Sequence, residues 1–229
     1  MSQIKLITHP DYLVLIPPTN CRVLSSAVLN GGLCDVGSFL NLKVDKEISM
    51  PLLAPEETLS NKATELALPQ PTTAMMTAAS MKSLGHSIEN SQGLSVECWV
   101  TSGLSNVRRV GDIADEKSSP GTINIWLYVN QPLSDAAMAE ALIMLTESKV
   151  TAVHDAGILS PISNLLASGT GTDSHAVFSP YGNRAFDYCG KHTLLGELIG
   201  RVVIKACSSS LNKSMNDKSY VFATPSLSK

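Results

Sequence analysis

Ile123-Asn124-Ile125-Trp126-Leu127-Tyr128-Val129 is a short, mostly apolar run, and a long helical pattern follows it from Ser134 to about Gly157. The first segment has the length and the apolar character of a buried strand. Ser134 is a suitable N-cap for the second, and Leu133 and Met138 have the spacing of a hydrophobic staple across that cap. Four apolar side chains are expected to face inward from this helix: Ala141, Leu142, Leu145 and Ala152. The stretch therefore predicts a strand followed by a helix, both packed into a core.

Similar patterns extend in both directions along the chain. Strands are expected at residues 4–7, 12–16, 22–29, 39–44 and 94–100, and helices at residues 55–68, 73–84 and 193–207. Because strands and helices alternate, we expect an α/β (or α+β) fold in one domain, with a mixed β-sheet between helical layers. The polar tail, residues 208–229, is expected to fray.

The composition limits the possible functions. The chain has 229 residues, of which 44% are hydrophobic and 16% charged, and its formal net charge is -3. This composition indicates a globular protein with a sizeable core. The sequence has no basic block of the kind that binds nucleic acid, and no apolar run is long enough to span a bilayer. Residues 1–9 lack the pattern of a secretion signal. Five cysteines without a Cys-x-x-Cys pair predict reduced, mostly buried thiols, a cytoplasmic protein and no structural zinc.

Two glycine-containing turns carry polar side chains that suit a ligand. Gly169-Thr170-Gly171-Thr172-Asp173 lies between a predicted helix and a short apolar run, and it places hydroxyls and a carboxylate on a loop. Residues 102–112 follow a predicted strand and include Arg108-Arg109, which suit a polar or anionic group. The alternative for each segment is an ordinary surface turn, with solvated arginines in the second.

Three further segments each allow two explanations. Asn124 lies inside an apolar strand, where an unsatisfied amide costs roughly 1–3 kcal/mol, so it either braces backbone or faces a pocket. Glu147 either lies on the exposed face of its helix or faces the sheet as an acid or base. Lys191 and His192 precede a predicted helix, whose N-terminus can receive an anion, and His192 is either structural or a proton-transfer residue.

Several familiar catalytic motifs do not occur in the sequence. It contains no Gly-x-Ser-x-Gly elbow, no P-loop and no Gly-x-Gly-x-x-Gly that opens a helix. Asp173, His175, His192 and Glu147 could bind a metal if the fold brought them together, but their spacing gives no direct support. No metal site is therefore predicted, and no required cofactor is inferred.

Taken in order, these segments resemble the adenosylcobinamide amidohydrolase family. The resemblance runs from about Val23 to Arg201 and does not cover the tail beyond Ser208. Its markers are Val23-Leu24-Ser25-Ser26-Ala27, Asn30-Gly31-Gly32, Leu40-Asn41, Thr77-Ala78-Ala79, Thr101-Ser102-Gly103-Leu104-Ser105-Asn106 with Arg109 and Gly111-Asp112, Gly121-Thr122-Ile123-Asn124-Ile125, Thr146-Glu147-Ser148-Lys149, Gly169-Thr170-Gly171-Thr172-Asp173 and Gly190-Lys191-His192-Thr193. One departure is Ser148, where the family pattern has alanine.

The resemblance implies a hydrolase of corrinoid salvage. It would cleave the amide between the aminopropanol arm and the corrin ring's propionate, giving adenosylcobyric acid and 1-amino-2-propanol. The cobalt-containing corrinoid is then a substrate and not a cofactor. Because a corrinoid is apolar on its faces and rimmed with amides, we expect a broad apolar pocket with uncharged donors and acceptors. The residues expected to bind it are Asn30, Asn41, Asn106, Arg109, Thr122, Asn124 and Thr170.

Amide hydrolysis needs an activated water or nucleophile, an oxyanion stabiliser and an acid for the leaving amine. The polar groups of the marker segments are assigned as follows: Asp173 or Glu147 as base, Thr172 as a candidate nucleophile, His192 as acid, and Lys191 or Arg109 as oxyanion stabiliser. General-base and covalent routes both remain open. All of these assignments require loops far apart in the chain to line one wide cavity.

Two other function classes remain open at this point. A corrinoid-binding or carrier protein would use the same pocket without hydrolysis, and its ionisable cluster would be dispensable. A phosphate-ligand enzyme would use residues 169–173 together with Arg108-Arg109, and nucleotides would compete with the corrinoid. The expected partner is in each case a small molecule, and the sequence gives no oligomeric state.

Overall fold

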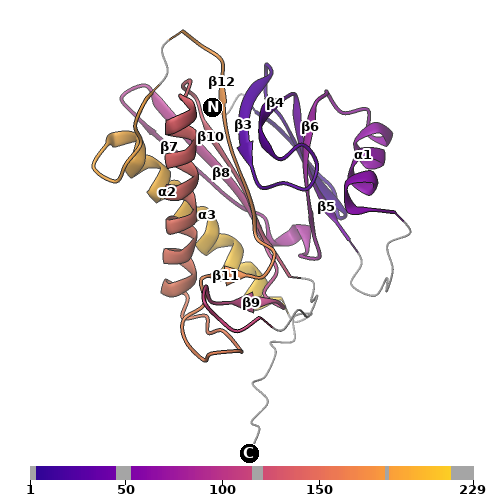
Figure 1. Ribbon diagram of the computed structural model, residues 1–229, viewed down its shortest axis with the longest axis vertical. Helices are drawn as coiled ribbons and strands as arrows, with labels where there is room; N and C mark the ends of the chain where they lie inside the picture. The colour runs from indigo at the N-terminus through magenta and orange to yellow at the C-terminus, as the bar shows by residue number, and fades with distance from the viewer. Residues whose placement is uncertain (1–3, 45–52, 115–120, 184–185, 218–229) are drawn as a thin grey trace, which may run out of the picture.

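The computed structural model describes residues 4–44, 53–114, 121–183 and 186–217, and their main strands form two β-sheets (Figure 1). The larger sheet has the strand order β4-β3-β12-β10-β8-β7, with bounds Gly32–Val36, Cys21–Ser25, Ser174–Pro180, Ile123–Val129, Leu94–Ser102 and Gly85–Ser91. The smaller sheet has the order β1-β2-β5-β6, with bounds Lys5–Thr8, Tyr12–Ile16, Ser38–Lys43 and Thr72–Thr77. A two-stranded ribbon pairs β9 (Val107–Arg108) with β11 (Gly169–Thr170).

Both sheets are mixed. In the larger sheet β10 and β12 run parallel, and in the smaller sheet β5 and β6 do so, while the neighbouring strands pair antiparallel. Helices α1 (Pro55–Glu65), α2 (Asp135–Asp155) and α3 (Leu194–Asn216) accompany them, with a short 3-10 helix, η1 (Met81–Ser83). The predicted mixed α/β class is therefore confirmed.

The layer order differs from the expected single sheet between helices. Figure 1 shows α2 and α3 on the outer face of the larger sheet and α1 on the outer face of the smaller one. The strand alternation explains this arrangement, because Ile125 and Leu127 of β10 pack toward α2 and α3, whereas Trp126 packs with Phe39 of the smaller sheet. A strand buried on both faces has no polar side to reveal what covers it, so the sequence pattern could not distinguish a helix from a second sheet.

The prediction of a helix at residues 73–84 is wrong. Residues 72–77 form β6, which pairs with β5 in parallel register from Ser38↔Thr72 to Lys43↔Thr77, and η1 follows. The alanines and methionines of this run favour a helix, but pairing with a buried neighbouring strand outweighed that local preference. Gly85, which follows the expected helix, begins β7, and a Cβ there would stand 2.1 Å from the carbonyl oxygen of Ala206 in α3.

The expected fraying from Ser208 onward is also wrong for the residues that the structure describes. Helix α3 continues to Asn216, and Ser210 and Ser214 are fully buried against the larger sheet. The Oγ atom of Ser102 on β8 lies 2.8 Å from the Oγ atoms of both serines, and the Ser214 hydroxyl donates to the Ser102 carbonyl oxygen at 2.6 Å. Because their hydroxyls bond to one another, these polar residues form part of a packed helical face. Residues 218–229 lie outside the described part of the chain.

The strong helix predicted after Ser134 is confirmed. The Ser134 hydroxyl oxygen accepts a hydrogen bond from the backbone N–H of Ala137 at 3.2 Å, and Ala141 and Leu145 are fully buried. A cap of this kind satisfies a backbone donor that would otherwise have no partner in the first turn. Helix α2 packs over the larger sheet and carries Lys149 to the region of the candidate site.

Candidate functional site

A buried amide network crosses the space between the two sheets at one end of their strands. Asn41 of β5 donates through Nδ2 to the Thr101 hydroxyl oxygen at 2.8 Å, and its Oδ1 accepts from Asn124 Nδ2 at 2.8 Å. Asn124 also donates to the carbonyl oxygen of Met76 at 3.0 Å. The side chain of Asn124 therefore braces the neighbouring sheet, although its Oδ1 has no hydrogen-bond partner among the described residues.

Asp173 fixes the adjacent turn between β11 and β12. Its carboxylate accepts hydrogen bonds from the backbone N–H groups of Ile123 (3.0 Å) and Thr170 (3.1 Å) and from the Thr170 hydroxyl (2.5 Å). Its Oδ2 atom lies 2.6 Å from the Nζ of Lys149 on α2, and both side chains are at most 10% exposed. A Cβ on Gly169 would stand 2.1 Å from Oδ2, so glycine at this position leaves room for the ion pair.

Hydroxyls of the same turn bond to the segment that precedes β10. Thr172 donates to the carbonyl oxygen of Gly121 at 2.9 Å, and its Oγ1 lies 2.8 Å from the Oγ1 of Thr122. The backbone N–H of Gly171 donates to the carbonyl oxygen of Asn106 at 2.9 Å. We call the residues at these neighbouring strand ends the strand-end site, and its members are Asn41, Asn106, Thr122, Asn124, Thr170, Thr172 and Asp173. Seven of the predicted site residues, from distant parts of the chain, are thus brought together.

The other predicted catalytic residues lie elsewhere. Glu147 forms an ion pair with Lys191, and both side chains are largely exposed. Glu147 precedes Lys149 by two residues, a rotation of about 200° around the helix, so the two side chains leave α2 on opposite sides. His192 is exposed beside Lys191, just before the Thr193 N-cap of α3. Asp173 and Asn106 therefore share one site, and His192 is not part of it.

Asn30 and Arg109 also lie apart from the strand-end site. Asn30 occupies the turn after β3 with a φ of 51°, and its Nδ2 donates to the carbonyl oxygen of Thr72 at 2.8 Å. Arg109 donates through Nη1 to the carbonyl oxygen of Leu166 at 2.8 Å and so holds two loops together. Both contacts are with backbone, which gives each side chain a structural role in this conformation.

Two buried residues near the strand-end site received no catalytic role from the sequence: Lys149 and His175. The Nδ1 atom of His175 lies 3.5 Å from the Thr146 hydroxyl oxygen, and its Nε2 has no hydrogen-bond partner among the described residues. Burial, together with the nearby Lys149 ammonium, lowers the pKa of His175 to about 4, and the Asp173 carboxylate partly opposes this shift. The imidazole is therefore neutral at neutral pH. Its position two residues after Asp173 on a strand was a usable signal, since alternation directs it toward the helices.

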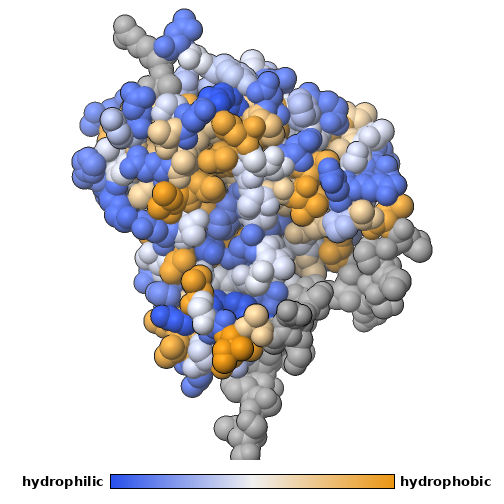
Figure 2. All heavy atoms as spheres, viewed as in Figure 1, coloured by the Kyte–Doolittle hydropathy of each residue, from blue (hydrophilic) through white to orange (hydrophobic). Residues whose placement is uncertain are grey.

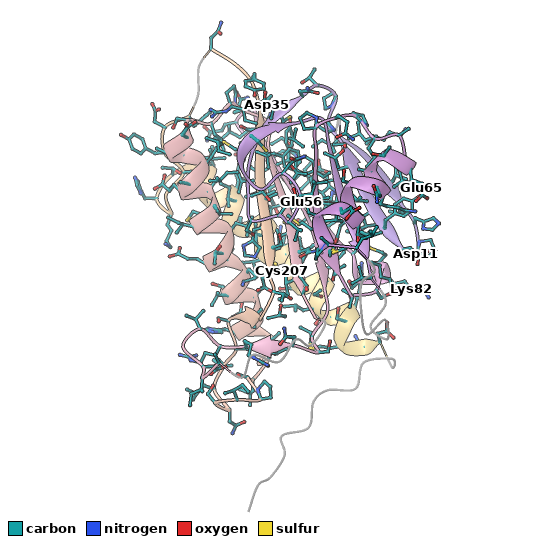
Figure 3. All side chains as sticks on the ribbon, turned by 45° about the vertical axis from the view of Figure 1, so that its right-hand side comes forward. Asp11, Asp35, Glu56, Glu65, Lys82 and Cys207 are labelled. Atoms are coloured by element: carbon teal, nitrogen blue, oxygen red, sulfur yellow. The ribbon has the colours of Figure 1, made fainter. Side chains whose placement is uncertain are left out.

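The interior next to Lys149 and His175 is apolar. Figure 3 labels Cys207 of α3, which is fully buried, and burial raises the pKa of its thiol to about 12. The nearby Lys149 lowers that pKa and Asp173 raises it. The five cysteines are free, and all except Cys34 are buried, as expected for reduced thiols.

Two findings concern metals and membranes. Within residues 4–44, 53–114, 121–183 and 186–217, no cluster of three or more His, Cys, Asp or Glu side chains could hold a metal ion. No helix in these ranges is long and apolar enough to cross a membrane.

The chain is similar to several known proteins. It is 35% identical over 159 residues to an uncharacterized protein of Methanocaldococcus jannaschii, an alignment that spans 61% of this chain and 62% of that relative, under two thirds of its length. It is 29% identical over 195 residues, 81% of this chain and 88% of the other, to a Methanosarcina mazei protein named adenosylcobinamide amidohydrolase. Among solved structures, a beta-aminopeptidase of Burkholderia sp. superposes with a TM-score of 0.45 at 9% identity, over 90% of this chain and 78% of that chain. The family model described as adenosylcobinamide amidohydrolase matches residues 1–219, and the chain therefore belongs to the adenosylcobinamide amidohydrolase family.

Proposed function

We propose that the protein hydrolyses adenosylcobinamide to adenosylcobyric acid and 1-amino-2-propanol. The observation that carries this proposal is family membership over residues 1–219. In the reaction, the oxygen of water attacks the amide carbonyl carbon, the bond from that carbon to nitrogen breaks, and the leaving amine takes up a proton. The cobyric acid product could re-enter cobamide synthesis, which would make the enzyme part of corrinoid salvage.

The polar character of the strand-end site supports a corrinoid substrate. Asn106, Thr122 and Thr172 offer uncharged donors and acceptors, the groups that match a ring rimmed with amides. Their backbone is held in place by the contact of Gly171 with Asn106 and by the bonds that Asp173 accepts. A preorganised polar site can orient one amide of a large ligand for attack.

For the base, we favour Asp173 over Glu147. Asp173 belongs to the strand-end site and Glu147 leaves the opposite side of α2, where it pairs with Lys191. On this proposal, Lys149 keeps Asp173 in place, and Thr172 contacts the substrate. His192 and Lys191 then have no part in proton transfer.

Mass spectrometry of an adenosylcobinamide digest tests the proposal directly. The wild-type protein should release 1-amino-2-propanol, with and without a chelator. Asp173→Asn should lower kcat by about a hundredfold or more, the usual contribution of a general base, while circular dichroism reports that the fold persists. Thr172→Val should also lower activity, whereas Glu147→Gln and His192→Ala should turn over like the wild type.

A corrinoid carrier is the alternative, and one observation favours it. Each carboxylate oxygen of Asp173 already accepts hydrogen bonds or pairs with Lys149, which is how a purely structural carboxylate would look. Tight binding of adenosylcobinamide without any release of aminopropanol would establish the carrier and reject the hydrolase.

A further inference from the structure

Two loops beside the strand-end site are joined by hydrogen bonds into one lobe. Residues 109–114 follow β9 and residues 158–168 precede β11. Val110 donates its backbone N–H to the Ser168 hydroxyl oxygen at 2.8 Å, and the Ser160 hydroxyl donates to the Asp112 carboxylate at 2.5 Å. The Ser160 hydrogen bond lowers the pKa of Asp112, so the carboxylate remains an acceptor at neutral pH. Together with the Arg109 contact to Leu166, these bonds hold the loops in one conformation.

This lobe carries an unusual concentration of exposed apolar side chains. Val110 is 85% exposed and Ile113 is 82% exposed, while Leu165 and Leu159 are 55% and 49% exposed. Figure 2 shows hydrophobic residues among hydrophilic ones at the lower end of the molecule, where Figure 1 places β9 and β11. A rigid apolar surface of this kind usually marks a binding site, because exposing it to water is unfavourable.

A hollow lies between the lobe and the loop that carries Asn106. It has a volume of about 300 Å³, and its lining includes Leu104, Ser105 and Val107 on one side and Ile158, Leu159 and Ser160 on the other. Ser105 directly precedes Asn106, and a Cβ on Gly121 would stand 2.8 Å from the Ser105 hydroxyl oxygen. Gly121 also accepts the Thr172 hydrogen bond through its carbonyl oxygen, so the hollow borders the lobe on one side and a neighbour of the strand-end site on the other. The hollow is at the lower limit for ligand pockets, so it can hold a substituent but not a macrocycle.

We propose that this lobe is the platform on which the apolar face of the corrin ring rests, with the polar strand-end site receiving the amide arm. The inference rests on the proposed function, since it takes the corrinoid as ligand. A wide ring with apolar faces and an amide rim matches an apolar platform next to amides and hydroxyls. Because the ring cannot enter the hollow, it must lie across the outer side chains, Val110 and Ile113 foremost.

Paired substitutions test the platform. Val110→Gln and Ile113→Gln remove apolar surface without adding charge, and both positions are exposed enough to tolerate the change. Each substitution should raise KM and the dissociation constant of adenosylcobinamide about tenfold and leave kcat unchanged. The reason is that losing an apolar contact to a substrate weakens its binding by a factor of this size. Ile143→Gln is the matched control: Ile143 is an exposed isoleucine on the outer side of α2, 58% exposed, and its replacement should change neither quantity.

Binding measured separately from turnover keeps the two proposals distinguishable. If the wild type binds adenosylcobinamide without hydrolysis and the lobe variants bind it tenfold more weakly, the platform holds and the hydrolase proposal fails. Unchanged KM and dissociation constant in Val110→Gln and Ile113→Gln would overturn the platform. Sedimentation of the same variants tests whether the surface instead binds a second copy of the chain. Loss of self-association with unchanged KM would assign the surface to that second copy and would also overturn the platform.

Discussion

Replacing Lys149 by methionine should destabilise the protein by about 3 kcal/mol. The substitution keeps an unbranched apolar stem of similar length but removes the ammonium that lies 2.6 Å from Asp173. Removing one partner of a buried pair leaves an uncompensated charge, at a cost of about 3–5 kcal/mol. Asp173 retains three hydrogen bonds from Ile123 and Thr170, which stabilise the carboxylate and place the expected loss at the lower end.

Urea unfolding followed by circular dichroism measures this loss. Arg201→Met is the matched control, since it breaks the exposed pair of Arg201 with Glu197, 2.9 Å apart, and should cost less than about 1 kcal/mol. The double variant Lys149→Met/Asp173→Asn removes both charges and should recover part of the loss, as expected for directly coupled residues.

The reasoning would be refuted if Lys149→Met cost no more than Arg201→Met. The same conclusion would follow if the free-energy changes of Lys149→Met and Asp173→Asn were simply additive in the double variant. Either result would mean that the two side chains do not form a buried pair in solution.

Three further outcomes are expected. Above pH 6.5 His175 is neutral in the folded and the unfolded protein, and as the pH falls to 4 only the unfolded chain takes up a proton there. The free energy of unfolding should therefore drop by about 3 kcal/mol over this range. Urea midpoints of the wild type and His175→Gln should diverge as the pH falls, and parallel curves would contradict this prediction. Gly169→Ala should cost about 2 kcal/mol, because the new Cβ would collide with the Asp173 carboxylate; an unchanged melting temperature would contradict the clash. Thr193→Ala should cost about 1 kcal/mol by uncapping α3, and Thr193→Ser should restore it in urea unfolding.

Local patterns were sufficient where the sequence and its immediate neighbours decide the structure. The strand at residues 123–129 and the helix capped by Ser134 follow from apolar spacing and cap chemistry, and both are confirmed. The run that forms β6 has helix-favouring residues, and only pairing with β5 makes it a strand. That information lies far away in the chain, where no local pattern can supply it.

In the candidate site, too, some features follow from local sequence and others depend on contacts between distant segments. Marker turns pointed to Asp173, Thr172 and Asn106, which the fold brings together, because glycines and hydroxyls on loops between regular elements are local features. The opposite orientations of Glu147 and Lys149 depend on which face of α2 meets the sheet. Helical spacing alone allowed either face, and the buried lysine was the less expected choice because burial of an ammonium requires a specific partner.

The serines at the end of α3 matter to anyone trimming this protein for crystallisation or display. Because the residues after Cys207 are mostly polar, truncation after Cys207 looks harmless. It would delete Ser210 and Ser214, however, and remove the hydrogen bonds that they make with the hydroxyl and carbonyl groups of Ser102. Ser102 is the final residue of β8 and leads directly into the loop that ends at Asn106. A deletion that looks harmless at the carboxyl terminus should therefore loosen the loop that carries Asn106 of the strand-end site.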